Sequence, residues 1–146
     1  MISDNNEGMS NPLQAGFEEV PHTADRALRV WAPDLPTLFA EAARGMYALM
    51  TPQAAAGPRI TRVFEVRAPD PEGRLVAFLS ELLYLLENEH LVFDRFAIDA
   101  QSSGLHVEMT GSPFQSLTGL VKAVTYHNLN IQRKRDRYEV EVVFDV

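Results

Sequence analysis

Three short segments hold the side chains that could do chemistry in this sequence. They are Pro21-His22-Thr23-Ala24-Asp25, the run VKAVTYH at 121–127, and the last three residues, Phe144-Asp145-Val146. No phosphate-binding glycine loop, nucleophile elbow, HExxH motif or EF-hand loop accompanies them. Any chemistry must therefore come from the way the fold brings these three segments together.

Carboxylates are concentrated at the end of the sequence. Asp145 lies next to Val146, whose α-carboxylate adds a second anionic group, and Asp25 adds a third if the last strand ends beside the bend at 21–25. Crowded carboxylates repel one another unless a cation or protons compensate them. Oxygen ligands alone favour a hard divalent ion, calcium or magnesium. The alternative is that Asp25 caps a turn and Asp145 is an ordinary solvated acid.

Lys122 and two histidines are the other candidates. Lys122 stands in an apolar run between Val121 and Ala123, so it is either a positioned cation or an edge-strand lysine that extends into water and blunts aggregation. His22 and His127 have the chemistry of zinc ligands, but isolated histidines in unrelated segments are more often hydrogen-bonded polar groups. Zinc is therefore the less favoured metal.

The composition is that of an ordinary soluble domain and excludes several classes of protein. The chain has 146 residues, 46% of them apolar and 23% charged, and no cysteine, so a single core without disulfides or cysteine-based metal sites is expected. A net charge of −7 argues against strong direct nucleic-acid binding, because such binding needs clustered Lys and Arg. The one basic cluster, at 133–137, falls in an expected hairpin turn and is most simply a solvated loop.

The chain is expected to divide into a flexible tail at 1–16 and a single domain at 17–146. The tail is rich in Asn, Ser and Gly and contains no apolar run, so it is neither a signal peptide nor a membrane anchor. The apolar stretch at 71–88 is interrupted by Ser80 and Glu81 and is shorter than the roughly 20 residues that a bilayer requires. A cytoplasmic protein without membrane contact is the expectation.

Apolar periodicity predicts an α+β fold. Two amphipathic helices are expected, one between a cap at Asp34 and the stop at Thr51-Pro52, the other at 71–88 after Asp70. Alternating patterns predict strands at 17–20, 26–32, 60–67, 91–99, 105–110, 120–133 and 137–145. Because the last four strands follow one another directly, a mainly antiparallel sheet with both helices packed on one face is expected.

Together these segments resemble the archease family. The resemblance covers 17–146 and rests on PHTAD, the helix DLPTLFAEAARGMYALMTP, the leucine-rich FLSELLYLLENEHLVFDRF, then GSPF, VKAVTYH and a closing FDV. It implies a small α+β metal-binding protein that is not an enzyme but docks transiently on the RtcB-type tRNA-splicing RNA ligase and activates it. That ligase uses GTP to form a covalent guanylyl-histidine; the activator promotes guanylylation and multiple turnover and can broaden nucleotide use.

The resemblance also implies roles for individual residues. Metal binding is implied for Asp25 of HTAD, Asp145 of FDV and the terminal Val146, and a part in activation for Lys122 of VKAVTYH. The metal triad therefore coincides with the carboxylates singled out by charge alone.

Two departures from the family pattern and two other functions bear on this interpretation. Related sequences often carry acids where this chain has Ser112 and Leu120, which affects the shape of that loop and any partner contact made through it.

A free-standing metal-dependent phosphoester hydrolase is the alternative function, although only His22 offers a nearby general base. A chaperone-like binder would need an exposed apolar patch, which the amphipathic helices do not require.

Overall fold

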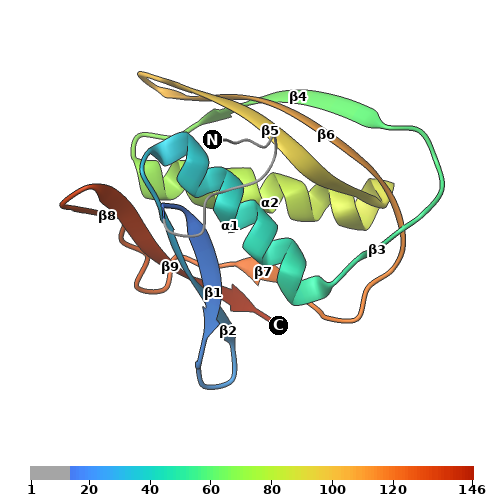
Figure 1. Ribbon diagram of the computed structural model, residues 1–146, viewed down its shortest axis with the longest axis horizontal. Helices are drawn as coiled ribbons and strands as arrows, with labels where there is room; N and C mark the ends of the chain where they lie inside the picture. The colour runs from blue at the N-terminus through green and yellow to red at the C-terminus, as the bar shows by residue number, and fades with distance from the viewer. Residues whose placement is uncertain (1–13) are drawn as a thin grey trace.

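The computed structural model describes residues 14–146 as two helices between two antiparallel sheets (Figure 1). The helices are α1 (Leu35–Met50) and α2 (Pro71–Glu89). The first sheet has the order β1-β2-β9-β7, with β8 also paired to β9; its strands are β1 (Gly16–Val20), β2 (Arg26–Ala32), β7 (Ala123–Val124), β8 (Gln132–Lys134) and β9 (Arg137–Asp145). The second sheet has the order β3-β6-β4, with β5 paired to β6; its strands are β3 (Gln53–Ala54), β4 (Ile60–Arg67), β5 (Leu91–Gln101) and β6 (Gly104–Ser116).

Both helices begin where the sequence supplies a cap. The Asp34 carboxylate accepts a hydrogen bond from the Thr37 N–H at 2.8 Å, and the Asp70 carboxylate accepts one from the Gly73 N–H at 2.7 Å. Each cap satisfies a backbone donor that has no partner inside the helix. The first residues of α1 and α2 are therefore set locally, and they agree with the expected helices.

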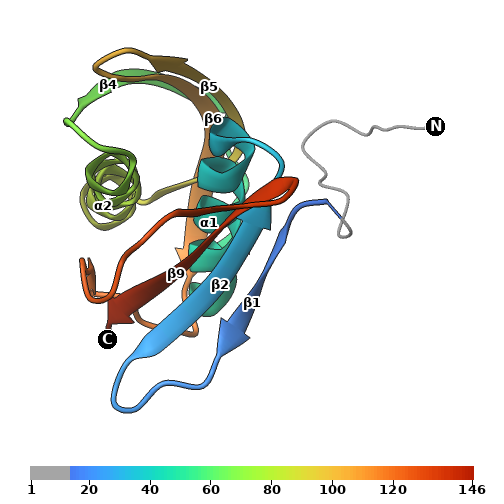
Figure 2. The same ribbon diagram turned by 90° about the vertical axis from the view of Figure 1, so that its left-hand side faces the viewer.

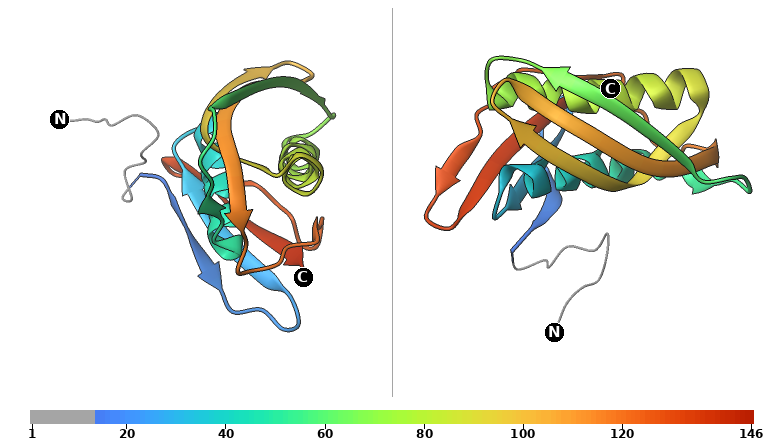
Figure 3. Two further views of the ribbon diagram at one scale, coloured as in Figure 1. Left: turned by 90° about the vertical axis from the view of Figure 1, so that its right-hand side faces the viewer. Right: turned by 90° about the horizontal axis from the view of Figure 1, so that it is seen from above.

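The core lies between the sheets and is built on the helices. Seen from the side, α1 and α2 separate the curved β4, β5 and β6 from β1, β2 and β9 (Figures 2 and 3). The ring of Phe78 in α2 lies 6.1 Å from that of Phe39 in α1 and 5.9 Å from that of Phe96 in β5. Phe144 of β9 is fully buried in the same cluster, so the end of the chain is fixed to the core.

The structure confirms the expected α+β class with two helices and antiparallel strands, and it differs in two details. The strands form two sheets instead of one, because the helices bury apolar residues on opposite sides and each side needs its own cover. The strand expected at 120–133 is wrong for most of its length, since only 123–124 and 132–134 are strand. A left-handed backbone at Asn128 (φ 52°) and a hydrogen bond from the Leu129 N–H to the Tyr126 carbonyl turn the chain between them.

The expected tail at 1–16 lies outside the described residues, apart from 14–16. There Ala15 is buried and Gly16 already begins β1, so the ordered fold includes these residues. Neither helix within residues 14–146 combines the length and apolar character needed to cross a membrane.

Candidate functional site

The three chemically interesting segments meet at one end of the first sheet, where β2 and β7 begin and β9 ends. We call this end the site edge. Strands β2 and β9 pair up to Arg26 opposite Phe144, and β7 pairs Ala123 with Asp145. Extending each register by one position sets Asp25 beside Asp145 on one side, and Lys122 beside the last residue on the other. Figure 1 shows this end of β9, and the C-terminus, next to β7. The fold thus brings together all four positions singled out in the sequence.

Side-chain alternation puts the two aspartates on the outer face of the sheet. Val142 and Phe144 of β9 are buried in the core, so Asp145, one residue further on, points to the opposite face. Leu28 faces the core from β2, and Asp25 lies three residues earlier, on the outer face as well. Residues that face each other across antiparallel strands lie about 4.5–5.5 Å apart at Cα, which is close enough for two carboxylates to share a cation.

The bend before β2 holds Asp25 in place. Ala24 adopts a left-handed conformation with a φ of 67°, which turns the chain sharply before the strand. At the first residue of β2, the Arg26 guanidinium donates to the Glu19 carboxylate at 2.9 Å and to the Leu49 carbonyl at 2.9 Å. The hydrogen bond from Arg26 lowers the pKa of Glu19 below its usual value, although partial burial opposes this shift. Sequence reasoning missed this anchor, because it joins residues from three elements.

The histidine pair lies against Asp25. His22 Nδ1 is 3.7 Å from an Asp25 carboxylate oxygen, is buried, and has no hydrogen-bond partner within residues 14–146. The ring of His127 meets that of His22 edge to face, with ring centres 6.0 Å apart. Two histidines from distant segments are therefore adjacent, which the sequence alone does not show.

A metal at this edge would be held by few side chains. Among residues 14–146, no three His, Asp or Glu side chains converge into a complete cation-binding cluster. Asp25 and Asp145 supply two carboxylates at facing positions of neighbouring strands, and the terminal Val146 stays the expected third ligand. Oxygen ligands of this kind suit calcium or magnesium better than zinc.

Lys122 is exposed on a segment whose backbone is fixed. Its N–H donates to the Asp145 carbonyl at 2.7 Å, and its neighbour Val121 is only 2% exposed. A Cβ on Gly119 would lie 2.0 Å from the Leu49 carbonyl oxygen, so only glycine allows this close approach to α1. The Lys122 ammonium has no ion-pair partner in the described part of the chain. No other side chain of residues 14–146 therefore neutralises its charge, and its backbone position is fixed.

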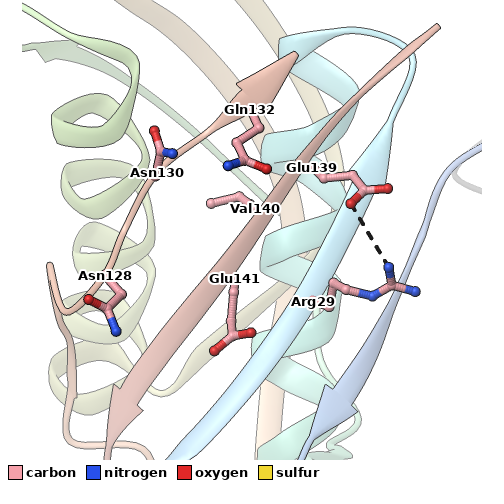
Figure 4. A pocket seen from close by; sticks show the side chains of 7 residues that line it. All are labelled: Arg29, Asn128, Asn130, Gln132, Glu139, Val140 and Glu141. Atoms are coloured by element: carbon pink, nitrogen blue, oxygen red, sulfur yellow. Dashed lines mark ion pairs between the residues drawn. The ribbon is translucent and has the colours of Figure 1, made fainter. Parts of the chain in front are cut away.

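The same outer face continues into a polar cleft of about 290 Å³ (Figure 4). It lies between β9 and the segment that returns alongside it, and it is lined by Arg29, Asn128, Asn130, Gln132, Glu139, Val140 and Glu141. Burial alone would raise the pKa of Glu139, but hydrogen bonds from Lys134 and Arg137 outweigh it, so the pKa is lowered. Two of the four basic residues at 133–137, Lys134 and Arg137, thus hold a buried carboxylate, while Arg135 lies exposed in the expected turn.

Comparison with known proteins identifies the fold and its family. A model of the Archease protein family matches residues 17–146. The chain belongs to the archease family. The archease of Methanosarcina barkeri is 30% identical over 142 residues, covering 89% of this chain and 95% of its own, and that of Methanopyrus kandleri is 32% identical over 138 residues, covering 89% and 99%.

Solved structures of related proteins agree. The solution structure of Methanobacterium thermoautotrophicum protein 1598 superposes with a TM-score of 0.69 at 29% identity, covering 90% of this chain and 99% of its own. The crystal structure of an archease from Thermotoga maritima, described as a possible chaperone, gives a TM-score of 0.65 at 19% identity, covering 94% and 98%. The second likeness supports the archease fold alone.

Proposed function

We propose that this protein is a metal-binding activator of a GTP-dependent, RtcB-type tRNA-splicing RNA ligase and has no enzymatic activity of its own. The observation that carries the proposal is the edge where an exposed, unpaired Lys122 adjoins two aspartates on neighbouring strands, in a chain of the archease family. The proposal places the protein in the cytoplasm, in transient contact with the ligase.

Guanylyl transfer explains why such an edge would be useful. Forming a guanylyl-histidine from GTP requires stabilisation of charge on the transferring phosphoryl group and on the departing pyrophosphate. The Lys122 ammonium would bind phosphate oxygens directly, because no carboxylate of its own chain neutralises it. Its fixed backbone would keep the charge in position, so little reorganisation is needed when the ligase binds.

A divalent cation would bind between Asp25, Asp145 and the α-carboxylate of Val146. Such an ion, calcium or magnesium, supplies positive charge that can bridge carboxylates and phosphate oxygens. The buried, unpartnered Nδ1 of His22 lies 3.7 Å from Asp25 and would orient that carboxylate from behind. Within the described residues no three His, Asp or Glu side chains converge, so nothing there favours the alternative of a two-metal phosphoester hydrolase.

A turnover assay tests the proposal. Purified ligase is supplied with RNA in excess and GTP, and this protein is added at less than one equivalent. We expect more ligation turnovers, no ligation or GTP hydrolysis by the protein alone, and weaker stimulation as salt rises, because screening slows charge-steered association. Hydrolysis of GTP or RNA without ligase would overturn the proposal in favour of a hydrolase.

A further inference from the structure

Four large apolar side chains within residues 14–146 are more than half exposed. They are Val63 (56%), Tyr84 (57%), Leu120 (57%) and Tyr126 (63%). Val63 lies in β4 and Tyr84 in α2. Leu120 and Tyr126, in contrast, lie two residues before and four residues after Lys122. The segment that presents the unpaired lysine therefore also presents two apolar side chains to solvent.

The backbone that carries Leu120 is tied down on both sides. The N–H groups of Thr118 and Gly119 both donate to the Met50 carbonyl at the end of α1, at 3.0 and 3.2 Å. Immediately after Leu120, the side chain of Val121 is buried in the core. Leu120 is therefore held out of the core by its own neighbours, although it is apolar.

The backbone that carries Tyr126 is fixed as well. Thr125 donates to the Val143 carbonyl of β9 twice, from its N–H at 3.1 Å and from its hydroxyl at 2.9 Å. The Tyr126 carbonyl accepts from the Leu129 N–H at 3.0 Å and closes a turn. An aromatic side chain held on rigid backbone loses little entropy on binding, which is the property of an interface anchor.

We infer that Leu120 and Tyr126 are two apolar anchors by which the protein docks on the RNA ligase, one on each side of Lys122. The inference rests on the proposed function. The ligase surface it requires has apolar recesses around a positively charged, nucleotide-binding centre. Burying the two anchors would then bring Lys122 and the carboxylate edge to that centre in one fixed orientation.

Charge decides between the possible occupants of this surface. Asp145 pairs with Ala123, which lies between the anchors in the sequence, and the chain has a net charge of −7, so a basic protein cleft is complementary to the surface. A second copy of the chain would bring like carboxylates together across a two-fold axis. RNA alone would bring its phosphates to a chain of negative net charge. A basic ligase cleft is therefore the occupant that the surface fits.

The two other exposed residues provide matched controls for the test. The double variant Leu120→Ser/Tyr126→Ala is compared with Val63→Ser/Tyr84→Ala, which removes apolar groups of similar exposure elsewhere. Ligase stimulation is titrated to obtain the concentration of protein that gives half-maximal effect and the maximal rate. We expect the first concentration to rise at least about tenfold for the anchor variant, with the maximal rate within about twofold and the control variant unchanged.

Several outcomes would overturn the inference. One is an unchanged half-maximal concentration for the anchor variant, and another is an equal loss in both double variants. A lower maximal rate at an unchanged half-maximal concentration would also overturn it, because the side chains would then act in the reaction and not in docking. So would sedimentation that shows a dimer of this chain dissolved by the anchor substitutions, or binding to RNA alone that they abolish.

Calorimetric titration of the ligase with this protein separates failure of the inference from failure of the proposed function. Wild-type protein that stimulates and binds the ligase, together with an anchor variant that binds equally well, overturns the docking surface alone. Wild-type protein that neither binds nor stimulates the ligase overturns both. Circular dichroism melting of each variant confirms the fold, which truncation of exposed side chains leaves intact.

Discussion

The two lysines of this chain lie at opposite ends of β9 and have opposite surroundings. Lys134, in β8 beside the start of β9, has its ammonium 3.0 Å from a carboxylate oxygen of Glu139, and Arg137 binds the same carboxylate. Lys122 lies opposite the end of β9, where the described residues offer it no carboxylate side chain as a partner, while Asp25 and Asp145 stand together without a Lys or Arg. We call the Glu139 end of β9, where cations compensate the carboxylate, the closed end. The Asp145 end, where no Lys or Arg of the described residues does so, is the open end.

The two ends differ in whether their charges have partners inside the folded chain. Glu139 is 7% exposed, so its negative charge must be compensated inside the molecule, and Lys134 and Arg137 do this. At the other end, Asp25 and Asp145 hold facing register positions, and neither forms an ion pair with a Lys or Arg among residues 14–146. Unpaired charge of this kind points to a bound ion or partner, as the proposed function requires.

The largest expected effect comes from removing the open end's carboxylates. Asp25→Asn and Asp145→Asn each keep the side chain's shape and remove a negative oxygen ligand, so the Kd for calcium or magnesium should rise at least about 100-fold. Isothermal titration calorimetry with each ion measures this. Asp136→Asn, in the exposed turn before β9, is the control and should leave the Kd unchanged. Equal binding by all variants would remove the metal from this edge.

The matched lysines give the next largest effect. Lys122→Ala should lower the maximal rate of ligase guanylylation by about 10- to 100-fold, since a positioned charge on a phosphoryl group is lost. Lys134→Ala should leave that rate unchanged. Lys122→Ala should unfold within about 0.5 kcal/mol of wild type in urea, as expected for an exposed lysine. Lys134→Ala should lose more stability, because the buried Glu139 carboxylate loses one of its cations. Equal stimulation by wild type and Lys122→Ala would make Lys122 an ordinary edge lysine.

Lys122→Arg sharpens the same comparison. The guanidinium keeps the charge but replaces a compact ammonium with a wide planar fork. Partial recovery of guanylylation would show that charge suffices, and no recovery would show that the compact geometry matters.

A third change tests the closed end. Glu139→Gln leaves Lys134 and Arg137 without their common anion and should lower the free energy of unfolding by about 1–3 kcal/mol, with ligase stimulation unchanged. The folded-state pKa of Glu139 is lowered from 4.5. The contribution of its ionised carboxylate to the free energy of unfolding is therefore complete above pH 4.5, and it is lost as pH falls through the folded-state pKa. Urea unfolding of wild type and variant at pH 7 and at lower pH measures this. A difference that does not narrow in acid would contradict the assignment.

How far the sequence predicts this molecule depends on whether a feature is local. The helix starts follow from Asp34 and Asp70, whose carboxylates accept hydrogen bonds from N–H groups three residues further on. The sequence could place Asp25 beside Asp145 only if β9 ended next to the bend at 21–25. The pairing of Arg26 with Phe144 shows that it does. Ligation of a metal there stays a prediction.

The features that the sequence did not predict depend on distant contacts. The expected strand at 120–133 fails because Val121 is held in the core while the turn after Tyr126 redirects the chain, and alternation alone cannot show such a turn. The approach of His22 to His127 joins segments about a hundred residues apart and needs the β7–β9 pairing to exist first. Long-range pairing therefore limits prediction of the site more than it limits prediction of the fold.

The smallest expected effect lies on the second sheet, at a charge pair that resembles the closed end but is exposed. His106 Nδ1 in β6 is 2.5 Å from a Glu65 carboxylate oxygen in β4, and the hydrogen bond raises the pKa of His106 above 6.5. A raised folded-state pKa gives stability that is complete below pH 6.5 and is lost as pH rises through the folded value. Glu65→Gln should bring the His106 pKa back toward 6.5, measured by NMR titration of the ring protons, without changing metal affinity or ligase stimulation. Because water screens both side chains, the unfolding curve should barely move. If Glu65→Gln lost ligase stimulation, a paired charge would also be needed for function. The presence or absence of an ion-pair partner would then not distinguish structural from functional residues in this fold.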